Sequence, residues 1–519
     1  MALTANRCID RSAVCYLLVV LVLAGFLRGL TLGESLWTDE LHTSWTVVGD
    51  LSEVGPRARI GNNSPTYFYA IWLVSKIFGH SEIAYRSLSW LAGLGLIIVA
   101  YFYAIRWTES KVIAVFVSTL MAIDSNLIFY SAEARPYAVL QLCMLFSTVH
   151  FFEYCSHGSR TSRLIWISTL ILGFHLHYTS LLLLAGQLAF AAIVLLYYRK
   201  QNATVDGFRP ATIVIDLIIV TAIIAFSSQH LFMIAGRRQN WAHFVHAADW
   251  ISIFNIFKTT RLVGIAILLL LVQKVIEHRN PKTQTSQTEW QCKNDQIRIL
   301  ILFFACCFLV PVMGAFIVNN LDIARLFFRR YLVSVIAPLY LTLALTTALS
   351  SAKFRIATAV LAVTFAVGWS TPIQTLLHGR QLAHSSEDWR GAIEKINETD
   401  RESVVVLRTG LIEEAGRESL FDSYEQFPVR AIYSLDASHP CVTLPLTTKV
   451  DSAFDLNSFT TPIDETAWLL IRGRQSTCDS VTQAVVDSTE SSNQGIRRVE
   501  VIEEFHFGRN IHLIRIKIE

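Results

Sequence analysis

Two adjacent carboxylates, Asp39 and Glu40, follow the first long apolar run of this sequence, in the segment ESLWTDELHT at residues 34–43. A carboxylate held next to a hydroxyl group can take its proton and act as a general base. Acidic residues after an apolar run are also often plain solvated charges, and for an isolated pair that interpretation is the better one. Trp37, two residues before Asp39, is typical of an anchor at the lipid–water boundary and is a candidate substrate contact.

A further acidic position, Glu133, occurs in SAEARPY at residues 131–137. This segment also contains Arg135 and Tyr137, which we expect to contact the donor phosphate and the substrate, respectively. An ionisable pair at the edge of a membrane is costly unless it lines a cavity or is paired. Glu133 is therefore either a second catalytic acid or the partner of Arg135 in a structural contact.

Two histidines, His175 and His177, lie two residues apart in the segment FHLHYTS. Such a pair can bind a divalent metal, but packing or hydrogen bonding is at least as good an explanation. The sequence therefore leaves a divalent metal open as a cofactor and requires none. Both histidines are candidates for contacting substrate.

Several arginines could bind the phosphate of a substrate. Arg329, Arg330 and Tyr331 open a late apolar run, and Arg237 and Arg238 precede another. A guanidinium matches the oxygens of a phosphate at the depth of lipid headgroups. The alternative is that these arginines extend to the headgroups of ordinary lipids.

Together these residue types suit a reaction with a membrane-bound phosphate as leaving group. A carboxylate would take the proton of an acceptor hydroxyl, and arginines would neutralise the phosphate as a glycosidic bond breaks through an oxocarbenium-like state. The elements that carry these residues must then place them on one side of a membrane.

The composition is that of a membrane protein, because 53% of the 519 residues are hydrophobic and only 16% are charged. A helix needs about 20 apolar residues to cross the hydrocarbon. The apolar runs predict about eleven spans, at residues 13–33, 82–105, 111–130, 135–154, 163–179, 181–198, 211–232, 260–274, 298–318, 331–350 and 355–376. The apolar segment 66–78 is either a further short span or a helix lying in the interface.

The orientation follows from the short loops in which lysine and arginine collect, since these loops remain in the cytoplasm. The rule predicts a cytoplasmic N-terminus. It places residues 34–64, the segment 125–136 and everything after residue 376 outside. The arginines at positions 237, 238, 325, 329 and 330 are exceptions on the outer side, where a cation is best explained by an anionic partner.

The last part of the chain differs from the rest. Residues 377–519 carry 15 Lys and Arg against 23 Asp and Glu, whereas residues 1–376 carry 29 against 18. A helix at 388–396 and strands at 403–408, 467–472, 499–505 and 510–518 predict a small soluble α/β domain, so we expect a membrane domain over 1–376 and this domain over 377–519. Cys441 and Cys478 could form a disulfide there, which spacing alone does not decide. The scattered cations exclude a nucleic-acid surface.

Several motifs occur in a characteristic order: SLWTDE, NNSPTYFYAIWLVSKIFGHSEIAYRSLSWLAGLG, FYSAEARPYAVL, FHLHYTS, RRYLVSVIAP and EDWRGAIEKI. In this order they resemble the GT-C glycosyltransferases, specifically the bacterial branch related to the dolichyl-phosphate-mannose protein mannosyltransferases and the aminoarabinose transferase of lipid A. The resemblance covers roughly residues 28–396.

The resemblance implies a multi-pass enzyme of the bacterial plasma membrane. It would use a polyprenyl-phosphate sugar, invert the anomeric centre and transfer the sugar to a glycan, lipid or protein hydroxyl. It also implies Asp39 as general base with Glu40 beside it, Glu133 as the second acidic position, and Arg330 with Tyr331 near the donor phosphate. Where relatives often have two prolines this chain has Asn62-Asn63-Ser64-Pro65, which predicts a different pocket edge there.

Two other classes of protein fit parts of the pattern. A transporter or flippase of a lipid-linked or small anionic substrate would also have many spans and charged residues near them. Transporters usually show repeats and broken helices at mid-bilayer, whereas the candidate residues here cluster at one boundary. A membrane scaffold with a degenerate site is less attractive because Asp39 and Glu40 are intact.

Overall fold

The computed structural model describes residues 11–61, 63–198, 210–227, 247–279, 287–380, 383, 386–399, 403–409, 426–444, 466–492 and 498–518. The chain divides into two compact units, one made of Met1–Leu30 and Leu88–Leu382 and the other of Thr31–Ser87 and Ala383–Glu519. We call the first the helical unit and the second the sheet unit. Arg237 and Arg238 lie outside the described residues.

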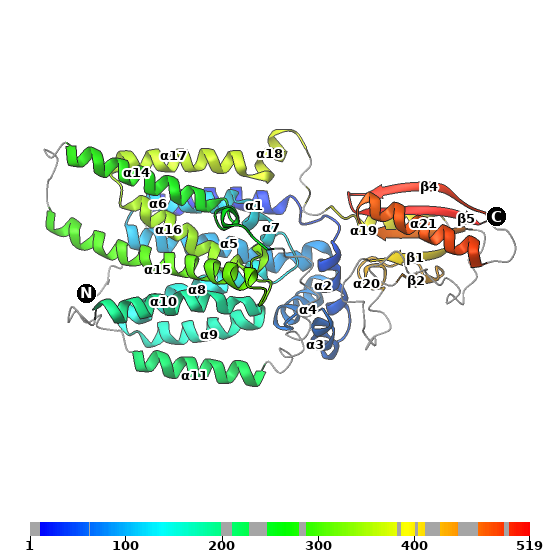
Figure 1. Ribbon diagram of the computed structural model, residues 1–519, viewed down its shortest axis with the longest axis horizontal. Helices are drawn as coiled ribbons and strands as arrows, with labels where there is room; N and C mark the ends of the chain where they lie inside the picture. Colours follow the sequence, from blue (N-terminus) through cyan, green and yellow to red (C-terminus); the bar gives the residue numbers. More distant parts are fainter. Residues whose placement is uncertain are drawn as a thin grey trace. The chain divides into compact units, whose positions relative to one another are not determined.

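The helical unit is built from long, roughly aligned helices (Figure 1). In chain order they are α1 (Arg11–Gly29), α5 (Glu82–Thr108, which begins in the sheet unit), α6 (Lys111–Ile123), α7 (Ser125–Ser131), α8 (Tyr137–His157), α9 (Arg160–Leu176), η1 (Tyr178–Ser180), α10 (Leu181–Tyr198), α11 (Pro210–Ser227), α13 (Trp250–Asn255), α14 (Thr259–Arg279), α15 (Gln287–Asn320), η4 (Arg329–Tyr331), η5 (Val333–Val335), α16 (Ile336–Ala348), α17 (Ala352–Trp369) and α18 (Thr371–Leu377).

The membrane-spanning character of this unit is confirmed. Eight spans among the described residues are long and apolar enough to cross a membrane, and α6 with α7, bent by 64° at their junction, make a ninth if they cross as a pair. The 17-residue α9 and the apolar α11 coincide with the two remaining predicted spans. The α16 span is almost entirely buried and α17 mostly exposed, so α16 runs through the core and α17 presents its side chains to lipid.

The bend between α6 and α7 has a local cause. The carboxylate of Asp124 accepts hydrogen bonds from the backbone N–H groups of Asn126 and Leu127, both at 2.9 Å, and so caps α7. The buried guanidinium of Arg28, on α1, donates to the carbonyl oxygens of Met121 and Ala122 at the end of α6, at 2.9 Å each. These carbonyls lose their helical partners at the break, and Arg28 satisfies them.

The sheet unit contains a five-stranded mixed sheet in the order β2-β1-β3-β5-β4. Strands β2 (Cys441–Thr443), β1 (Val404–Arg408) and β3 (Thr466–Arg472) are parallel, whereas β5 (Ile511–Ile518) and β4 (Val499–Phe507) continue the sheet antiparallel. The helices of this part are α19 (Trp389–Thr399), α20 (Phe427–Arg430) and α21 (Gln475–Ser492). The predicted α/β fold of the tail is therefore confirmed. Sequence analysis missed only β2 among these strands, because three residues are too few to show alternation.

The core of this sheet lies under α21. Buried side chains of β1, β3 and β5, including Val406, Leu469 and Ile514, pack against Cys478 and Val485 of α21. Strand β3 is a continuous apolar run, as expected for a central strand that is covered on both faces. Cys441 and Cys478 are both free cysteines in this structure, so the disulfide that the sequence left open is not formed.

The sheet unit also contains α2 (Thr38–Val48), α3 (Leu51–Ile60) and α4 (Thr66–Phe78). With 13 residues, α4 is too short to span a membrane. It buries Tyr67, Phe68 and Ile71 and exposes Ile77 and Phe78. This two-sided character fits the interfacial helix that the sequence left as one option.

The grouping of residues 31–87 with the C-terminal part differs from the predicted boundary at residue 376. Side chains of the tail hold this segment through Glu387, Arg390 and Tyr433. Hydropathy does not report such contacts, because they join residues 349 and 397 positions apart.

Candidate active site

Asp39 lies in the first turn of α2, within the sheet unit. Its neighbour Trp37 is the N-cap residue of that helix, and the Trp37 backbone N–H donates to Glu40 Oε2 at 3.4 Å. The N-terminal end of a helix carries partial positive charge, which stabilises a carboxylate there. Asp39 is partly exposed, whereas Glu40 beside it is fully buried.

Glu40 forms a two-pronged ion pair with Arg86, near the start of α5. Arg86 Nε donates to Glu40 Oε1 at 2.8 Å and Arg86 Nη2 to Glu40 Oε2 at 2.5 Å, and neither side chain is exposed. The same guanidinium donates to the carbonyl oxygens of Thr31, Leu32 and Glu34 at 2.7–3.0 Å. Glu40 and Arg86 therefore fix the loop that leads into α2. Sequence analysis did not single out Arg86, although it lies in the quoted motif as part of IAYRSLSW.

Glu387 fixes the first residue of α2 from the other side. Its Oε2 accepts from the backbone N–H of Thr38 at 3.0 Å, from Thr38 Oγ1 at 2.7 Å and from Trp389 Nε1 at 2.9 Å. Its Oε1 accepts from Arg472 Nε on β3 at 2.7 Å. The EDWRGAIEKI motif thus has a structural explanation, because its first residue holds the N-terminus of the helix that carries Asp39.

Two further tail residues complete this anchoring. Arg390 Nη1 donates to Glu82 Oε1 at 2.8 Å. The hydroxyl of Tyr433 accepts from the Leu36 N–H at 2.7 Å and donates to the same Glu82 oxygen at 3.0 Å. Burial raises the pKa of Tyr433 well above its usual range, so this hydroxyl keeps the proton that it donates.

In the helical unit, the structure brings together four predicted residues from three separate segments. The Arg330 guanidinium lies 5.9 Å from the ring centroid of Tyr137, at the start of α8. The Tyr137 ring lies 5.6 Å from that of His177, which in turn lies 5.9 Å from Tyr331. Residues more than 190 positions apart thus form one aromatic and cationic group, which we call the Arg330 cluster.

Glu133 and Arg135 lie in the turn between α7 and α8, and both are buried. The Arg135 backbone N–H donates to the Glu133 carbonyl at 2.8 Å, and the Arg135 carbonyl accepts from Ser89 Oγ on α5 at 3.0 Å. This turn leads directly into Tyr137 of the Arg330 cluster. Their roles as second acid and phosphate ligand stay predictions.

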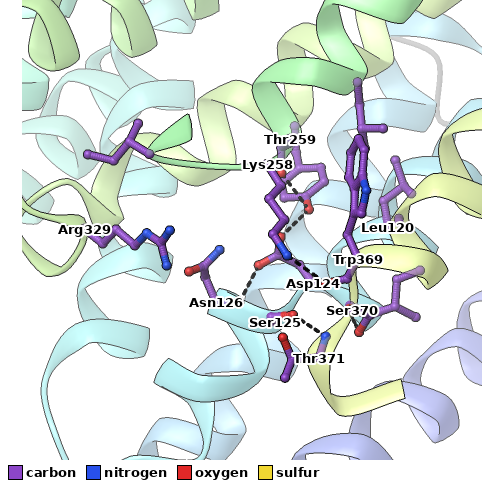
Figure 2. A pocket seen from close by; sticks show the side chains of 15 residues that line it. Leu120, Asp124, Ser125, Asn126, Lys258, Thr259, Arg329, Trp369, Ser370 and Thr371 are labelled. Carbon is purple, nitrogen blue, oxygen red and sulfur yellow. Dashed lines mark hydrogen bonds between the residues drawn. The ribbon is translucent and has the colours of Figure 1, made fainter. Parts of the chain in front are cut away.

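Arg329 diverges from its neighbour Arg330 and lines a separate pocket of about 100 Å³. Figure 2 shows its guanidinium directed towards Asn126, with Lys258, Asp124, Ser125 and Thr371 around the same space. Since a water molecule in the liquid takes about 30 Å³, the pocket has room for a small anionic group or a few waters.

The walls of this pocket are fixed by hydrogen bonds. Tyr340 Oη donates to Asp124 Oδ2 at 2.9 Å, Lys258 Nζ donates to the Trp369 carbonyl at 3.1 Å, and the Thr371 N–H donates to Ser125 Oγ at 3.0 Å. The pocket lining thus contains two cations, Lys258 and Arg329, and one carboxylate, Asp124, which already accepts a hydrogen bond from Tyr340. Sequence analysis missed Lys258, which is the lone lysine in its loop and gives no pattern.

The histidine pair does not extend into a metal centre within the described part of the chain. His175 lies in the last turn of α9 with its ring 5.4 Å from Phe174, whereas His177 joins the Arg330 cluster. The group of three or more potential ligands found among the described residues lies elsewhere and includes neither histidine. A metal at this pair thus gains no support from the geometry.

Comparison with known proteins places these features in context. Residues 62–228 match the family model of dolichyl-phosphate-mannose-protein mannosyltransferases. The crystal structure of ArnT from Cupriavidus metallidurans bound to undecaprenyl phosphate superposes with a TM-score of 0.53 at 11% identity, over 97% of each chain. Its apo form gives a TM-score of 0.39 at 13% identity over the same shares. No curated protein matches the sequence. The resemblance drawn from the ordered motifs is confirmed.

Proposed function

We propose that this chain, an integral membrane protein related to the GT-C glycosyltransferases, transfers a sugar from a polyprenyl-phosphate donor to a hydroxyl acceptor. The observation that carries the proposal is the ArnT-like fold over 97% of the chain. The ArnT structure holds undecaprenyl phosphate, and a lipid phosphate of this kind is the donor class that we assign here.

In the proposed reaction Asp39 takes the proton of the acceptor hydroxyl, and the acceptor oxygen forms a bond to the anomeric carbon. The bond between that carbon and the phosphate oxygen breaks, and the polyprenyl phosphate leaves with the electron pair. A single displacement of this kind inverts the anomeric centre. The support for Asp39 is its place in the first turn of α2. Arg86 holds the loop that leads into this helix, and Glu387 holds its first residue, Thr38. Glu40, engaged by Arg86, acts as a positioning residue.

Cations neutralise the leaving phosphate. We assign this role first to Arg330 with Tyr331, and then to Arg329, Arg135 and Arg237. Support for Arg330 comes from its stacking on Tyr137, which pre-orients the guanidinium and lowers the cost of ordering it on the ligand. Support for Arg329 comes from the phosphate-sized pocket that it lines together with Lys258.

The contacts to substrate and the location of the reaction follow the sequence analysis. Tyr137, His177, His175 and Trp37 are proposed to contact substrate. The transfer takes place on the non-cytoplasmic side of a bacterial plasma membrane, with the N-terminus in the cytoplasm and the soluble domain outside. The acceptor is a glycan, a lipid or a protein, and the sugar is a hexose or a pentose.

The test is transfer of labelled sugar from a polyprenyl-phosphate donor in proteoliposomes. We expect Asp39→Asn to lower the transfer rate by about 10²–10⁴-fold, the contribution of a general base. The matched control is Asp295→Asn, because Asp295 is a 65% exposed carboxylate that pairs with Arg298 on the same helix. Full transfer by Asp39→Asn would exclude the base role. Movement of the carrier by the wild type without any sugar transfer would favour a transporter instead.

A further inference from the structure

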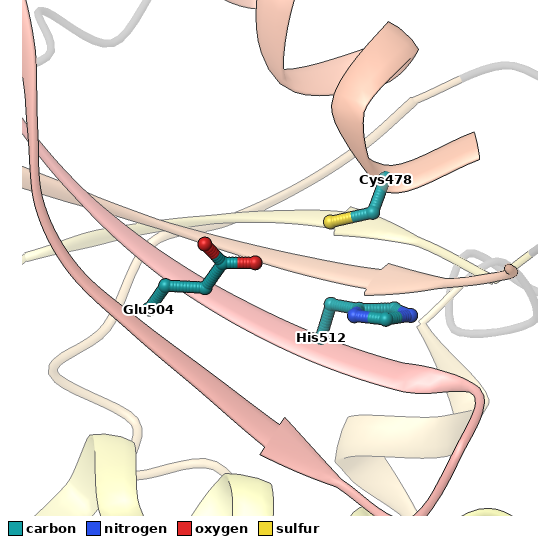
Figure 3. A group of neighbouring side chains, drawn as sticks. All are labelled: Cys478, Glu504 and His512. Carbon is teal, nitrogen blue, oxygen red and sulfur yellow. The ribbon is translucent and has the colours of Figure 1, made fainter. Parts of the chain in front are cut away.

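Three potential metal ligands that are not among the candidate active-site residues meet in the sheet unit. Cys478 of α21, Glu504 of β4 and His512 of β5 each place a ligand atom within 4.8 Å of those of the other two (Figure 3). Cys478 and His512 are buried, whereas Glu504 is partly open to solvent. The three residues come from two strands and the helix packed on them, so no local sequence motif reveals them.

The register of the hairpin directs the ligands to one face. His506 lies directly opposite His512, and Glu504 lies opposite Ile514, so all four side chains share a face of the sheet. Ile514 belongs to the core under α21 together with Cys478. The neighbouring Phe505 points to the other face, where Lys395 of α19 lies 5.0 Å from its ring. The α21 face thus carries Glu504, His506, His512 and Cys478.

His512 is held as metal-binding histidines usually are. Its Nε2 lies 3.1 Å from the Gly473 carbonyl, which can only accept, so Nε2 carries the proton. The lone pair is then on Nδ1. A backbone carbonyl that fixes the tautomer in this way is the usual outer contact of a ligating histidine. The His506 Nδ1 lies 3.0 Å from this Nδ1 and donates to it, so a metal at His512 replaces that hydrogen bond.

Cys478 is the most deeply buried of the three candidate ligands. Its side chain is fully buried in an otherwise apolar core. A bound transition metal converts such a thiol to the thiolate and releases its proton.

We propose that Cys478, Glu504 and His512 bind a divalent transition metal, best fitted by Zn²⁺. A thiolate, a carboxylate and an imidazole nitrogen are the ligand types of tetrahedral zinc. Zinc bonds of about 2.0–2.3 Å place neighbouring ligand atoms about 3.5 Å apart. The ligand atoms now lie within 4.8 Å of one another, and Glu504 is an exposed side chain that accepts from Gln475 Nε2 at 3.2 Å. The metal would join α21 to the β4–β5 hairpin.

The experiment uses the full-length chain in detergent, stripped with a chelator and titrated with Co²⁺. We expect stoichiometric binding with a near-ultraviolet sulfur-to-cobalt charge-transfer band, and displacement of Co²⁺ by Zn²⁺. Cys478→Ser should lose the band. Cys441→Ser should keep it, because Cys441 is a free cysteine of the same unit outside the cluster.

A second variant guards against misfolding of Cys478→Ser. Glu504→Gln changes an exposed side chain, so the domain should stay folded, and we expect it to weaken Zn²⁺ binding at least about tenfold. The proposal is overturned if the wild type shows no charge-transfer band, if Cys478→Ser keeps it, or if folded Glu504→Gln binds Zn²⁺ as tightly as the wild type. These readouts do not depend on sugar transfer, so they are independent of the proposed function.

Discussion

At the residue scale, the buried pair of Glu40 and Arg86 shows how a carboxylate that looks catalytic can be structural. Both side chains are fully buried, and the guanidinium also satisfies a row of carbonyl oxygens. An arginine suits this place because its fork of donors serves the carboxylate and the backbone at once. Of the two adjacent acids, Asp39 is therefore the one that we propose for chemistry.

Breaking this pair should cost far more than breaking a surface pair. Removing one member leaves a buried charge without its partner, which costs about 3–5 kcal/mol. We expect Glu40→Gln to lower the free energy of unfolding by that order, measured by SDS titration of the detergent-solubilised chain. Glu53→Gln is the control, because Glu53 is 36% exposed and pairs with Arg57 across one turn. Its loss should stay below about 1 kcal/mol. Equal losses would contradict the structural role of Glu40.

Arg330 differs from the nearby Arg325 in its surroundings. It stacks on Tyr137 and Phe328, whereas Arg325 pairs with the exposed Asp322. If Arg330 stabilises the leaving phosphate, Arg330→Ala should lower sugar transfer by about 10²-fold or more, as loss of one charge-stabilising group usually does. Arg325→Ala should leave transfer within a few-fold of the wild type. The rates are measured in proteoliposomes, and a similar loss in both variants would point to a general effect of cations in this segment.

At the scale of elements, the break between α6 and α7 shapes one end of the helical unit. Asp124 caps α7, accepts from Tyr340, and thereby forms one wall of the Arg329 pocket. Arg28 fills the carbonyl positions that the break leaves open. A straight helix over residues 111–131 would place Asn126 and Ser125 differently, so the bend is a condition for the pocket.

Replacing Asp124 should therefore destabilise the unit. Loss of the cap costs about 1 kcal/mol, and the buried Tyr340 hydroxyl that loses its acceptor adds about 1–3 kcal/mol. We expect Asp124→Ala to lose about 2–4 kcal/mol in the same SDS titration. Ser110→Ala removes the cap of α6, where the contact to the Ile113 N–H is a weaker 3.4 Å, and should lose about 1 kcal/mol or less. The cap interpretation fails if Asp124→Ala is no less stable than Ser110→Ala.

At the scale of the whole molecule, the sheet unit joins two distant stretches of chain. Glu387 connects the start of α2 to β3, since it accepts from Thr38 and Arg472. The C-terminal sheet therefore has a role beyond its own fold, because it holds the helix that carries Asp39.

Loss of Glu387 should loosen this segment selectively. We expect Glu387→Ala to raise amide hydrogen exchange in residues 34–41 and to lower sugar transfer, while α8 stays as protected as in the wild type. Glu394→Ala is the control, because Glu394 is an exposed carboxylate on α19, the helix that follows Glu387. Unchanged exchange at 34–41 in the Glu387 variant would show that the contact does not hold α2.

Part of the candidate site followed from the sequence. The ordered motifs named Tyr137, His177, Arg330 and Tyr331, and the structure brings these four together. The same motifs gave no role to Arg86 or Glu387, and they grouped Arg329 with Arg330 although the two side chains diverge. Adjacent residues in a tight 3₁₀ turn point in different directions, which spacing along the chain does not resolve.

The sequence by itself determined the helices of the membrane domain and most strands of the sheet, because apolar length and alternation are local properties of the chain. Tertiary structure decided which residues share a unit, that Arg86 pairs with Glu40, and that His512 lies near Cys478. These outcomes depend on side chains that lie tens to hundreds of positions apart and meet only when helices and strands pack. Burial then makes each such pairing obligatory, since a charge or polar group left without a partner there is too costly to keep.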